Sequence, residues 1–150
     1  MEEEAKQAAL AYLNAHHVAT LATVGPEGPW ASAVFYVNTG FIIYFLTENH
    51  TRHGRNLAAN SLVAAAIHED YSDWEEIKGI QLFGKAAPVG AMEKSQVLGL
   101  FIQKFSSLKT FLRVPDYLKI VTRAQVYRLT PQELWYLDNQ KGFSSRQKVL

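Results

Sequence analysis

Apolar residues recur along this chain with two different periods, and the period changes from one segment to the next. Within 3–16, one face carries residues spaced three and four apart, namely Ala5, Ala9, Tyr12, Leu13 and His16. This spacing predicts an amphipathic helix. Short runs rich in β-branched and aromatic residues follow, which is typical of strands. The pattern predicts strands over 18–24, 30–37, 41–46, 62–67 and 79–89, and helices over 51–59 and 92–105.

The last third of the chain carries a proline that bears on its structure. Pro115 disfavours helix at the residue before it, and we expect a strand over 117–129. A capped turn is predicted at 130–133, before a last strand over 134–137. Six or seven short strands joined by tight turns, with helices inserted, predict a mainly β (α+β) fold built on a closed or nearly closed antiparallel barrel. The length of 150 residues is that of one domain, so we expect a single domain over 1–150.

Composition excludes several classes of protein. Without cysteine there are no disulfides, no thiolate metal ligands and no cysteine nucleophile. No run approaches the roughly 20 apolar residues of a membrane span, and the acidic start lacks the apolar stretch of a secretory signal. We therefore expect a cytoplasmic protein without a membrane partner.

The net charge of +1 conceals an asymmetry between two parts of the chain. Residues 1–100 carry 6 Lys/Arg against 11 Asp/Glu, and residues 101–150 carry 9 against 3. This division fits complementary surfaces on two subunits, and it fits two solvated faces of one domain equally well. It does not predict nucleic-acid binding.

The most informative segment is 47–57, where a strand leads into a helix. Thr51 is the expected helix cap, and Arg52, His53 and Arg55 occupy the first turn. Helix starts usually carry acidic residues because their N–H groups make that end positive. A cluster of cations there is favourable when a phosphate binds to the N–H groups, the Thr51 hydroxyl and the cationic side chains. The alternative is a solvated basic turn.

This order of features resembles the pyridoxamine 5′-phosphate oxidase superfamily of FMN-binding split β-barrels. The resemblance rests on the hairpin over 31–46, on the segment Leu46 to Leu57 and on the later run Ile80 to Ala86. It extends to the chain end over 134–146. It implies a six- to seven-stranded antiparallel split barrel with flanking helices, which binds FMN as a homodimer with flavin sites shared between subunits.

The resemblance also implies which residues bind the cofactor. The strand backbone along the flavin ring matches Ser32, Ala33, Val34, Phe35 and Tyr36. Leu46 and Thr47 follow, and Thr51, Arg52 and His53 match the phosphate-binding positions. Gln81 lies near the position of a flavin-contacting glutamine, and Trp135, Lys141 and Arg146 belong to the segment that completes the partner's flavin site.

The departures from the family pattern bear on the reaction. The vitamin-forming oxidase has cations at the positions of Ala31 and Tyr36, so we do not expect pyridoxamine phosphate as substrate. His53 replaces the usual lysine and titrates near neutral pH in its unperturbed state. Since no nucleophile motif is present, the flavin carries whatever chemistry occurs. No catalytic residue is named.

We expect an FMN-dependent oxidoreductase that transfers hydride to or from a small organic substrate. Two alternatives stay open: a non-catalytic carrier or sensor that binds FMN or haem, and a deazaflavin-dependent reductase. His50 and His53 lack a third metal ligand at suitable spacing, so no metal site is predicted. The aromatic side chains of 101–117 are expected in the core or in a subunit interface.

Overall fold

Seven strands and five α-helices follow one another along residues 2–150, the part of the chain that the computed structural model describes. The strands are β1 (Val18–Gly25), β2 (Gly28–Thr39), β3 (Ile42–Thr47), β4 (Leu62–His68), β5 (Lys78–Pro88), β6 (Gln125–Asp138) and β7 (Arg146–Lys148). The helices are α1 (Glu2–Ala15), α2 (Arg52–Ala59), α3 (Ala91–Lys104), α4 (Leu108–Phe111) and α5 (Pro115–Arg123). Two 3-10 turns are η1 (Trp74–Glu76) and η2 (Asn139–Lys141). Up to α3, each predicted strand and helix is confirmed.

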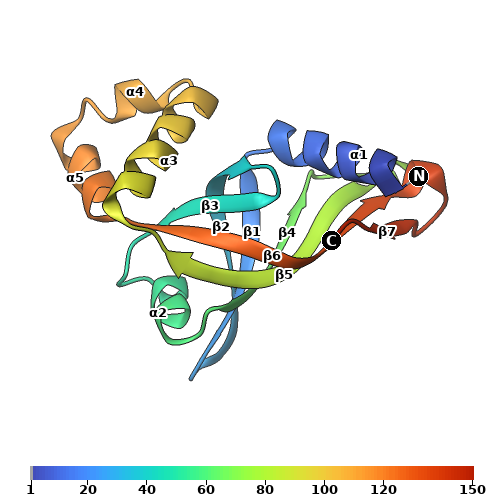
Figure 1. The fold of residues 1–150 in the computed structure, drawn as a ribbon, viewed down its shortest axis with the longest axis horizontal. Coiled ribbons are helices and arrows are strands. Elements are labelled where there is room, and N and C mark those ends of the chain that lie inside the picture. Colours follow the sequence, from blue (N-terminus) through green and yellow to red (C-terminus); the bar gives the residue numbers. More distant parts are fainter. Residues whose placement is uncertain (1) are drawn as a thin grey trace.

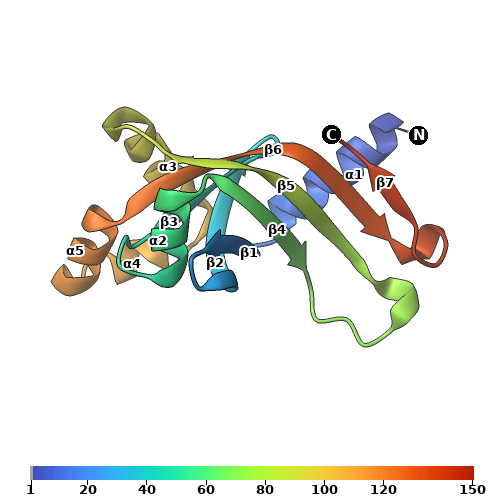
Figure 2. The same ribbon diagram turned by 90° about the horizontal axis from the view of Figure 1, so that it is seen from below.

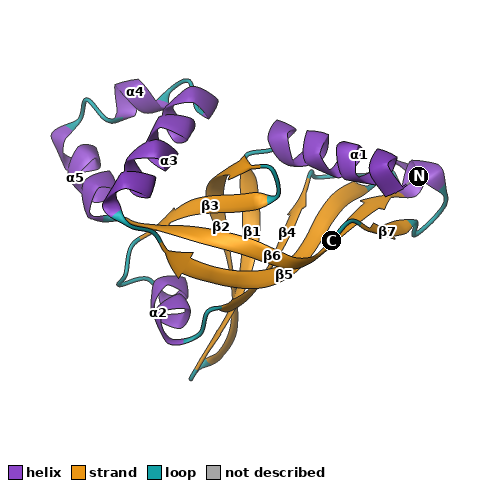
Figure 3. Ribbon diagram, viewed as in Figure 1, coloured by secondary structure: helices purple, strands orange, loops and turns teal. Residues whose placement is uncertain are grey.

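The strands form an antiparallel barrel. They pair in the order β3–β2–β1–β4–β5–β6, and β6 pairs back with β3, which closes six strands on themselves. Strand β6 is long enough to pair with two neighbours in succession on one edge. Its residues 125–129 pair with β3, and its residues 135–137 pair with β7 (Figures 1 and 3). The predicted mainly β barrel with flanking helices is confirmed.

The barrel interior is filled by alternate residues of each strand. In β1 the side chains of Ala19, Leu21 and Thr23 are buried, while those between them face outward. Thr23 is polar, and its hydroxyl accepts a hydrogen bond from the Asn56 amide of α2 at 3.1 Å. Because a strand has a period of two, the same alternation divides every strand into a core face and an outer face.

The expected strand over 117–129 is wrong in its first half. Residues 115–123 form helix α5, and strand β6 begins only at Gln125. Pro115 is the first residue of this helix, where a missing N–H costs nothing and a fixed φ suits the helix. Lys94 of α3 then donates to the carbonyls of Thr122 and Ala124 at the end of α5, at 2.8 and 2.6 Å.

The expected turn at 130–133 is also wrong, because β6 runs through it without a break. Pro131 stands opposite Gly84 at a shift of register in β5–β6, next to the point where pairing with β3 has ended. A proline is tolerated in a strand at such an irregularity, since no ladder bond requires its N–H. A Cβ on Gly84 would lie 2.2 Å from the Thr130 carbonyl oxygen, which explains the glycine there.

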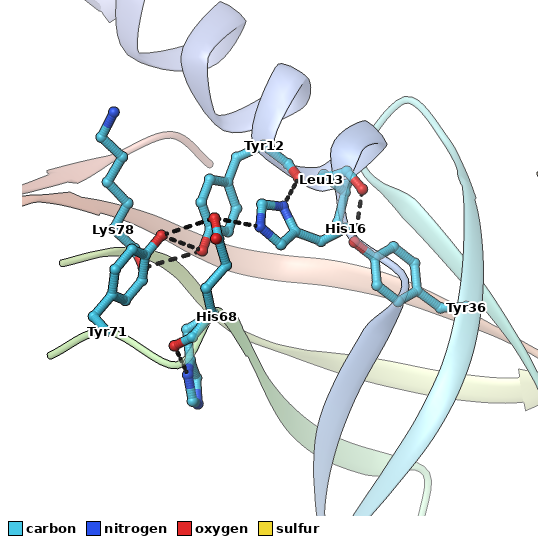
Figure 4. A network of polar contacts seen from close by, with 8 residues as sticks. Tyr12, Leu13, His16, Tyr36, His68, Tyr71 and Lys78 are labelled. Carbon is cyan, nitrogen blue, oxygen red and sulfur yellow. Dashed lines mark hydrogen bonds and ion pairs between the residues drawn. The ribbon is translucent and has the colours of Figure 1, made fainter. Parts of the chain in front are cut away.

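Helix α1 covers one side of the barrel with the face that the sequence predicts. Ala5, Ala9, Tyr12 and Leu13 are buried. The buried Tyr36 hydroxyl donates to the Leu13 carbonyl at 2.6 Å and so joins β2 to the helix (Figure 4). The two small alanines let the helix approach the sheet closely.

A polar network holds the end of α1 against the loop between β4 and β5. The hydroxyls of Tyr12 and Tyr71 lie 3.0 Å apart, and Tyr71 donates to the Glu69 carboxylate at 3.2 Å. The His16 ring lies between the Tyr12 carbonyl oxygen (2.6 Å) and the Glu69 carboxylate (2.9 Å) (Figure 4). Because both of these groups are acceptors, His16 satisfies both when it carries two protons.

A second, smaller core lies outside the barrel. Val97 and Phe101 of α3 pack on the outward side chains of Val37, Tyr44 and Val126, from β2, β3 and β6. Helices α4 and α5 extend from this side, at the end of the molecule away from β7 (Figure 1).

Candidate functional site

Helix α2 begins directly after Thr51, whose side chain caps it. The Thr51 hydroxyl accepts from the Gly54 N–H at 3.1 Å and donates to the Glu48 carbonyl at 2.7 Å. A Cβ on Gly54 would lie 2.4 Å from that carbonyl oxygen, so only glycine permits this tight turn. The predicted cap is confirmed. Both hydrogen bonds keep the hydroxyl occupied within the chain.

Two backbone N–H groups at the start of α2 have no acceptor. The first hydrogen bond between main-chain groups in this turn runs from the Arg55 N–H to the Thr51 carbonyl at 2.9 Å. The N–H groups of Arg52 and His53 donate to no acceptor among residues 2–150. Such N–H groups at a helix start carry partial positive charge and bind anions readily.

Arg52 adds a cation beside these two N–H groups. Its guanidinium stacks over the Trp30 ring at 4.2 Å, and Nη2 donates to the Glu27 carbonyl at 3.2 Å. Its Nε is buried and makes no hydrogen bond, although the Glu27 carboxylate lies 3.5 Å away. The β1–β2 hairpin therefore fixes the guanidinium in place and leaves one donor unsatisfied.

His53 fastens α2 to the end of β3. Its Nε2 hydrogen-bonds with the hydroxyl of the buried Thr47. Burial lowers the pKa of His53, so the ring is mostly uncharged near neutral pH. An anion at this helix start would thus meet the His53 N–H and a neutral ring, and Arg52 supplies a full positive charge in the first turn.

The five predicted residues of β2 do not form one surface. Val34 and Tyr36 are core side chains, whereas Ala33 and Phe35 face outward on the barrel. The Ser32 hydroxyl is buried without a hydrogen-bond partner. The side chains divide in this way because successive residues of a strand point to opposite faces. A flat ligand outside β2 would therefore contact the strand backbone together with Ala33 and Phe35. Leu46 lies outside the barrel core in the adjacent strand β3, among the residues that pack on the second core.

The four remaining predicted residues lie apart from α2. Gln81 and Trp135 are cross-strand neighbours on β5 and β6, and the Trp135 indole donates to Glu133 at 2.6 Å. Lys141 in η2 pairs with Glu4 of α1 at 2.9 Å, and Arg146 is exposed on β7. Figures 1 and 2 show η2 and β7 at one end of the barrel and α2 at the other. The structure therefore brings the predicted residues together in two groups within one chain.

Outward residues of β2, β1 and β4, all small, form a band that continues onto larger residues of β5 and β6. One cross-strand row is Ala33, Thr20, Ala66, Gln81 and Trp135, and the next is Ala31, Ala22, Ala64, Phe83 and Glu133. Larger apolar side chains border the band and are about half exposed, among them Phe35 at 64% and Val24 at 51%. Contiguous exposed apolar surface of this kind marks an interaction site.

Sequence reasoning missed the two residues that hold the Arg52 guanidinium, Glu27 and Trp30. Both belong to the turn and strand that follow β1, and the hairpin brings them back over α2. A signal was present in the spacing: the turn at 25–29 lets β1 and β2 form a long hairpin, so its tip reaches beyond the barrel (Figure 1).

Residues 2–150 contain neither a candidate metal site nor a candidate membrane-spanning helix. No set of three or more histidine, cysteine or acidic side chains is arranged to hold a metal ion. No helix there is long and apolar enough to cross a membrane.

Comparison of the sequence with known proteins identifies relatives of this chain. The profile described as pyridoxamine 5′-phosphate oxidase matches residues 5–138. A UPF0306 protein of Serratia proteamaculans is 28% identical over 145 residues, which cover 95% of this chain and 93% of that protein. A UPF0306 protein of Photorhabdus laumondii is 27% identical over 137 residues, 90% of this chain and 88% of that protein.

Solved structures share the fold. A haem binding protein from Mycobacterium smegmatis superposes with a TM-score of 0.72 at 25% identity, covering 98% of this chain and 56% of that one. The haem storage protein HutZ from Vibrio cholerae gives 0.68 at 21%, with 83% and 88% covered. A putative pyridoxamine 5′-phosphate oxidase from Listeria innocua gives 0.68 at 17%, with 89% and 98% covered.

Proposed function

Because the chain belongs to the pyridoxamine 5′-phosphate oxidase family, we propose that it binds FMN and acts as an oxidoreductase on a small organic substrate. The observation that carries this proposal is the start of α2, where two unpaired N–H groups accompany the Arg52 guanidinium, which among residues 2–150 pairs only with Glu27, at 3.5 Å through its Nε. Two N–H donors and a guanidinium suit a terminal phosphate, whose oxygens are strong acceptors. Bound FMN would supply hydride transfer through its ring.

The chain's own residues would hold and orient the cofactor. Gly54 and the Thr51 cap fix the direction of the two N–H groups, and Trp30 fixes the Arg52 guanidinium. The ring would extend along the outer side of β2 and β3, where Ala33 leaves room and Phe35 offers an apolar face.

The flavin site of one chain is incomplete, and we propose that a second copy completes it. Gln81, Trp135, Lys141 and Arg146 lie away from α2 in the same chain. A two-fold arrangement of two barrels through the band of small residues would bring these residues to the partner's β2 and α2. Alanine and threonine along the band allow close approach of two sheets. We expect an interface of obligate size, above about 2,000 Å² in total.

Light scattering tests the assembly. With FMN present at micromolar protein, the mass should be twice the 16.9 kDa of the chain. A monomer mass under these conditions would contradict the shared site.

Titration with FMN tests the phosphate site through Arg52→Ala. The substitution removes a charge-assisted hydrogen bond worth about 1.5–3 kcal/mol, so affinity should fall roughly 10- to 150-fold. Arg55→Ala is the matched control, because Arg55 occupies the same turn but donates to the His50 carbonyl. Riboflavin lacks the phosphate and should not distinguish Arg52→Ala from the wild type.

Equal FMN affinity of Arg52→Ala and the wild type would place the anion elsewhere. The unfolding midpoint without cofactor should change little, since a partly exposed ion pair such as Arg52–Glu27 contributes at most about 1 kcal/mol. A loss of FMN binding together with a large loss of stability would mean that Arg52 acts on the fold.

Haem is the second candidate cofactor, because two proteins with this fold are described as haem binding and haem storage proteins. The absorption spectrum of the purified protein separates the two candidates. A pair of bands close to those of free flavin supports FMN, and a sharp Soret band supports haem.

A further inference from the structure

An apolar cavity lies between the barrel and helices α3, α4 and α5. Its volume is about 390 Å³. Phe35 and Leu46 line it on the barrel side, and Phe101, Phe105, Phe111 and Leu118 line it on the helix side. Cavities that bind small organic molecules occupy roughly 300–1,000 Å³ and have mostly apolar walls. This cavity has the size and lining of a ligand site.

The cavity exists because α4 reaches the second core only through the partly buried Leu108, and α5 contributes no residue to that core. Helix α3 fills the outer side of β2, β3 and β6 with Val97 and Phe101, but neither α4 nor α5 buries any residue. Leu118 of α5 is 48% exposed and Phe111 of α4 is 42% exposed. Phe111 stacks on Tyr117 with ring centroids 4.3 Å apart, and this contact joins α4 to α5.

The charges around the cavity indicate an uncharged ligand. Residues 104–123 carry five cations and one carboxylate, yet no charged side chain lines the cavity. Its polar lining is limited to Ser107 and Thr122, and the Thr122 hydroxyl already donates to the Leu118 carbonyl at 2.7 Å. An anionic or cationic group placed inside would lose its water without gaining a partner.

The cavity adjoins the strands that the flavin would contact. Phe35 of β2 and Leu46 of β3 lie one step beyond the cross-strand pair Tyr36–Phe45, so they are neighbours on the outer face. The next residue of β3, Thr47, hydrogen-bonds with His53 at the start of α2. The end of β3 thus contacts both the proposed phosphate-binding turn, through Thr47, and the cavity wall, through Leu46.

We propose that this cavity binds an uncharged, largely hydrophobic small organic molecule. Its role as the substrate site of the flavoprotein rests on the proposed function. Binding of the molecule is tested separately from FMN binding, since the lining residues come from β2, β3, the three helices α3, α4 and α5 and the segments between these helices.

Two ligands that share a ring skeleton test the proposal. N-phenyl-1-naphthylamine is uncharged and becomes fluorescent in apolar surroundings, and 8-anilinonaphthalene-1-sulfonate adds a negative charge to the same skeleton. The uncharged probe should bind with one site per chain, and the sulfonate should bind more weakly. Both titrations are run with and without FMN.

A matched pair of variants at α4 locates the site. Ser107, the residue before α4, lines the cavity, is exposed and makes no capping hydrogen bond, so Ser107→Trp fills the cavity without removing a side-chain hydrogen bond. Thr110→Trp places the same side chain three residues later, within α4 and outside the lining. Affinity for the uncharged probe should fall at least about tenfold in Ser107→Trp, because placing the probe in a cavity that the indole already fills is costly. Affinity should not change in Thr110→Trp.

The outcomes separate this proposal from the flavin assignment. Failure of the wild type to bind the uncharged probe, or equal binding by both variants, would overturn the cavity proposal whether or not FMN binds. Probe binding that depends on residue 107, in a protein that does not bind FMN, would support the cavity and reject the flavoprotein. Conversion of a dimer to a monomer by Ser107→Trp, with no probe bound by the wild type, would assign the cavity to a subunit interface and overturn the proposal.

Discussion

Helices α1 and α5 have apolar residues at helical spacing and lie toward opposite ends of the molecule, but of the two only α1 buries residues against the barrel (Figure 1). Four residues of α1 enter the core, and Tyr36 and Glu69 hold its end by hydrogen bonds. Helix α5 buries no residue, although Leu118 and Ile120 are apolar. An apolar face on a helix therefore does not guarantee a packed interface. The outcome depends on whether the surface opposite the face is complementary.

The difference in packing separates a structural side of the molecule from a binding side. Where α1 lies, Ala5, Ala9, Tyr12 and Leu13 are buried against the barrel. Where α4 and α5 lie, phenylalanine and leucine side chains face an open volume of about 390 Å³. Regions with few buried apolar contacts open most easily and are the ones that ligand binding uses.

The largest expected effect is on the α1 side and follows from burial. Leu13 is fully buried, and Leu13→Ala should lower the free energy of unfolding by about 2–5 kcal/mol through lost apolar contacts and a new cavity. Leu118→Ala removes the same atoms from a side chain that is 48% exposed, and should change stability by no more than about 0.5 kcal/mol. Urea unfolding of both variants measures the contrast.

Similar losses in the two variants would show that α5 is packed in solution against something that one chain alone lacks. A second copy of the chain would then be the first protein to consider, and the loss in Leu118→Ala would depend on protein concentration.

A smaller effect concerns the polar network at the end of α1 and depends on pH. The His16 and Tyr71 hydrogen bonds lower the pKa of Glu69 below its ordinary value of 4.5. Because the folded-state pKa is lowered, the stabilisation is fully present above the ordinary value and is lost as pH falls through the folded-state pKa. The unfolding midpoints of the wild type and Glu69→Gln should differ at pH 6 and converge toward about pH 3.

Asp116→Asn in α5 is the matched control for this pH profile. Asp116 forms no ion pair or side-chain hydrogen bond with the rest of residues 2–150, so its substitution removes a carboxylate without removing such a contact. A profile for Glu69→Gln that runs parallel to the wild type at every pH would mean that the network adds nothing to the attachment of α1.

Much of the fold could be predicted from sequence because the signals are local. The alternation in Val18–Gly25 and the glycine-rich turn after it specify a strand and a hairpin without reference to other segments. The start of α2 was predicted for the same reason, since Thr51 and Gly54 act within one turn. The helix at 115–123 was missed because Pro115 favours either a helix start or a break, and the choice depends on contacts such as Lys94 with the end of α5.

The sequence by itself determined the alternation that fills the barrel, the cap of α2 and the cluster of cations beside it, because each depends on residues close together in the chain. Only the tertiary structure decided that Arg52 lies against Trp30 and Glu27, that the predicted cofactor residues form two groups, and that α3, α4 and α5 enclose an apolar cavity. These features bring together segments that are distant in sequence. Such contacts depend on strand register and on the volume of side chains in three dimensions, which no local pattern encodes.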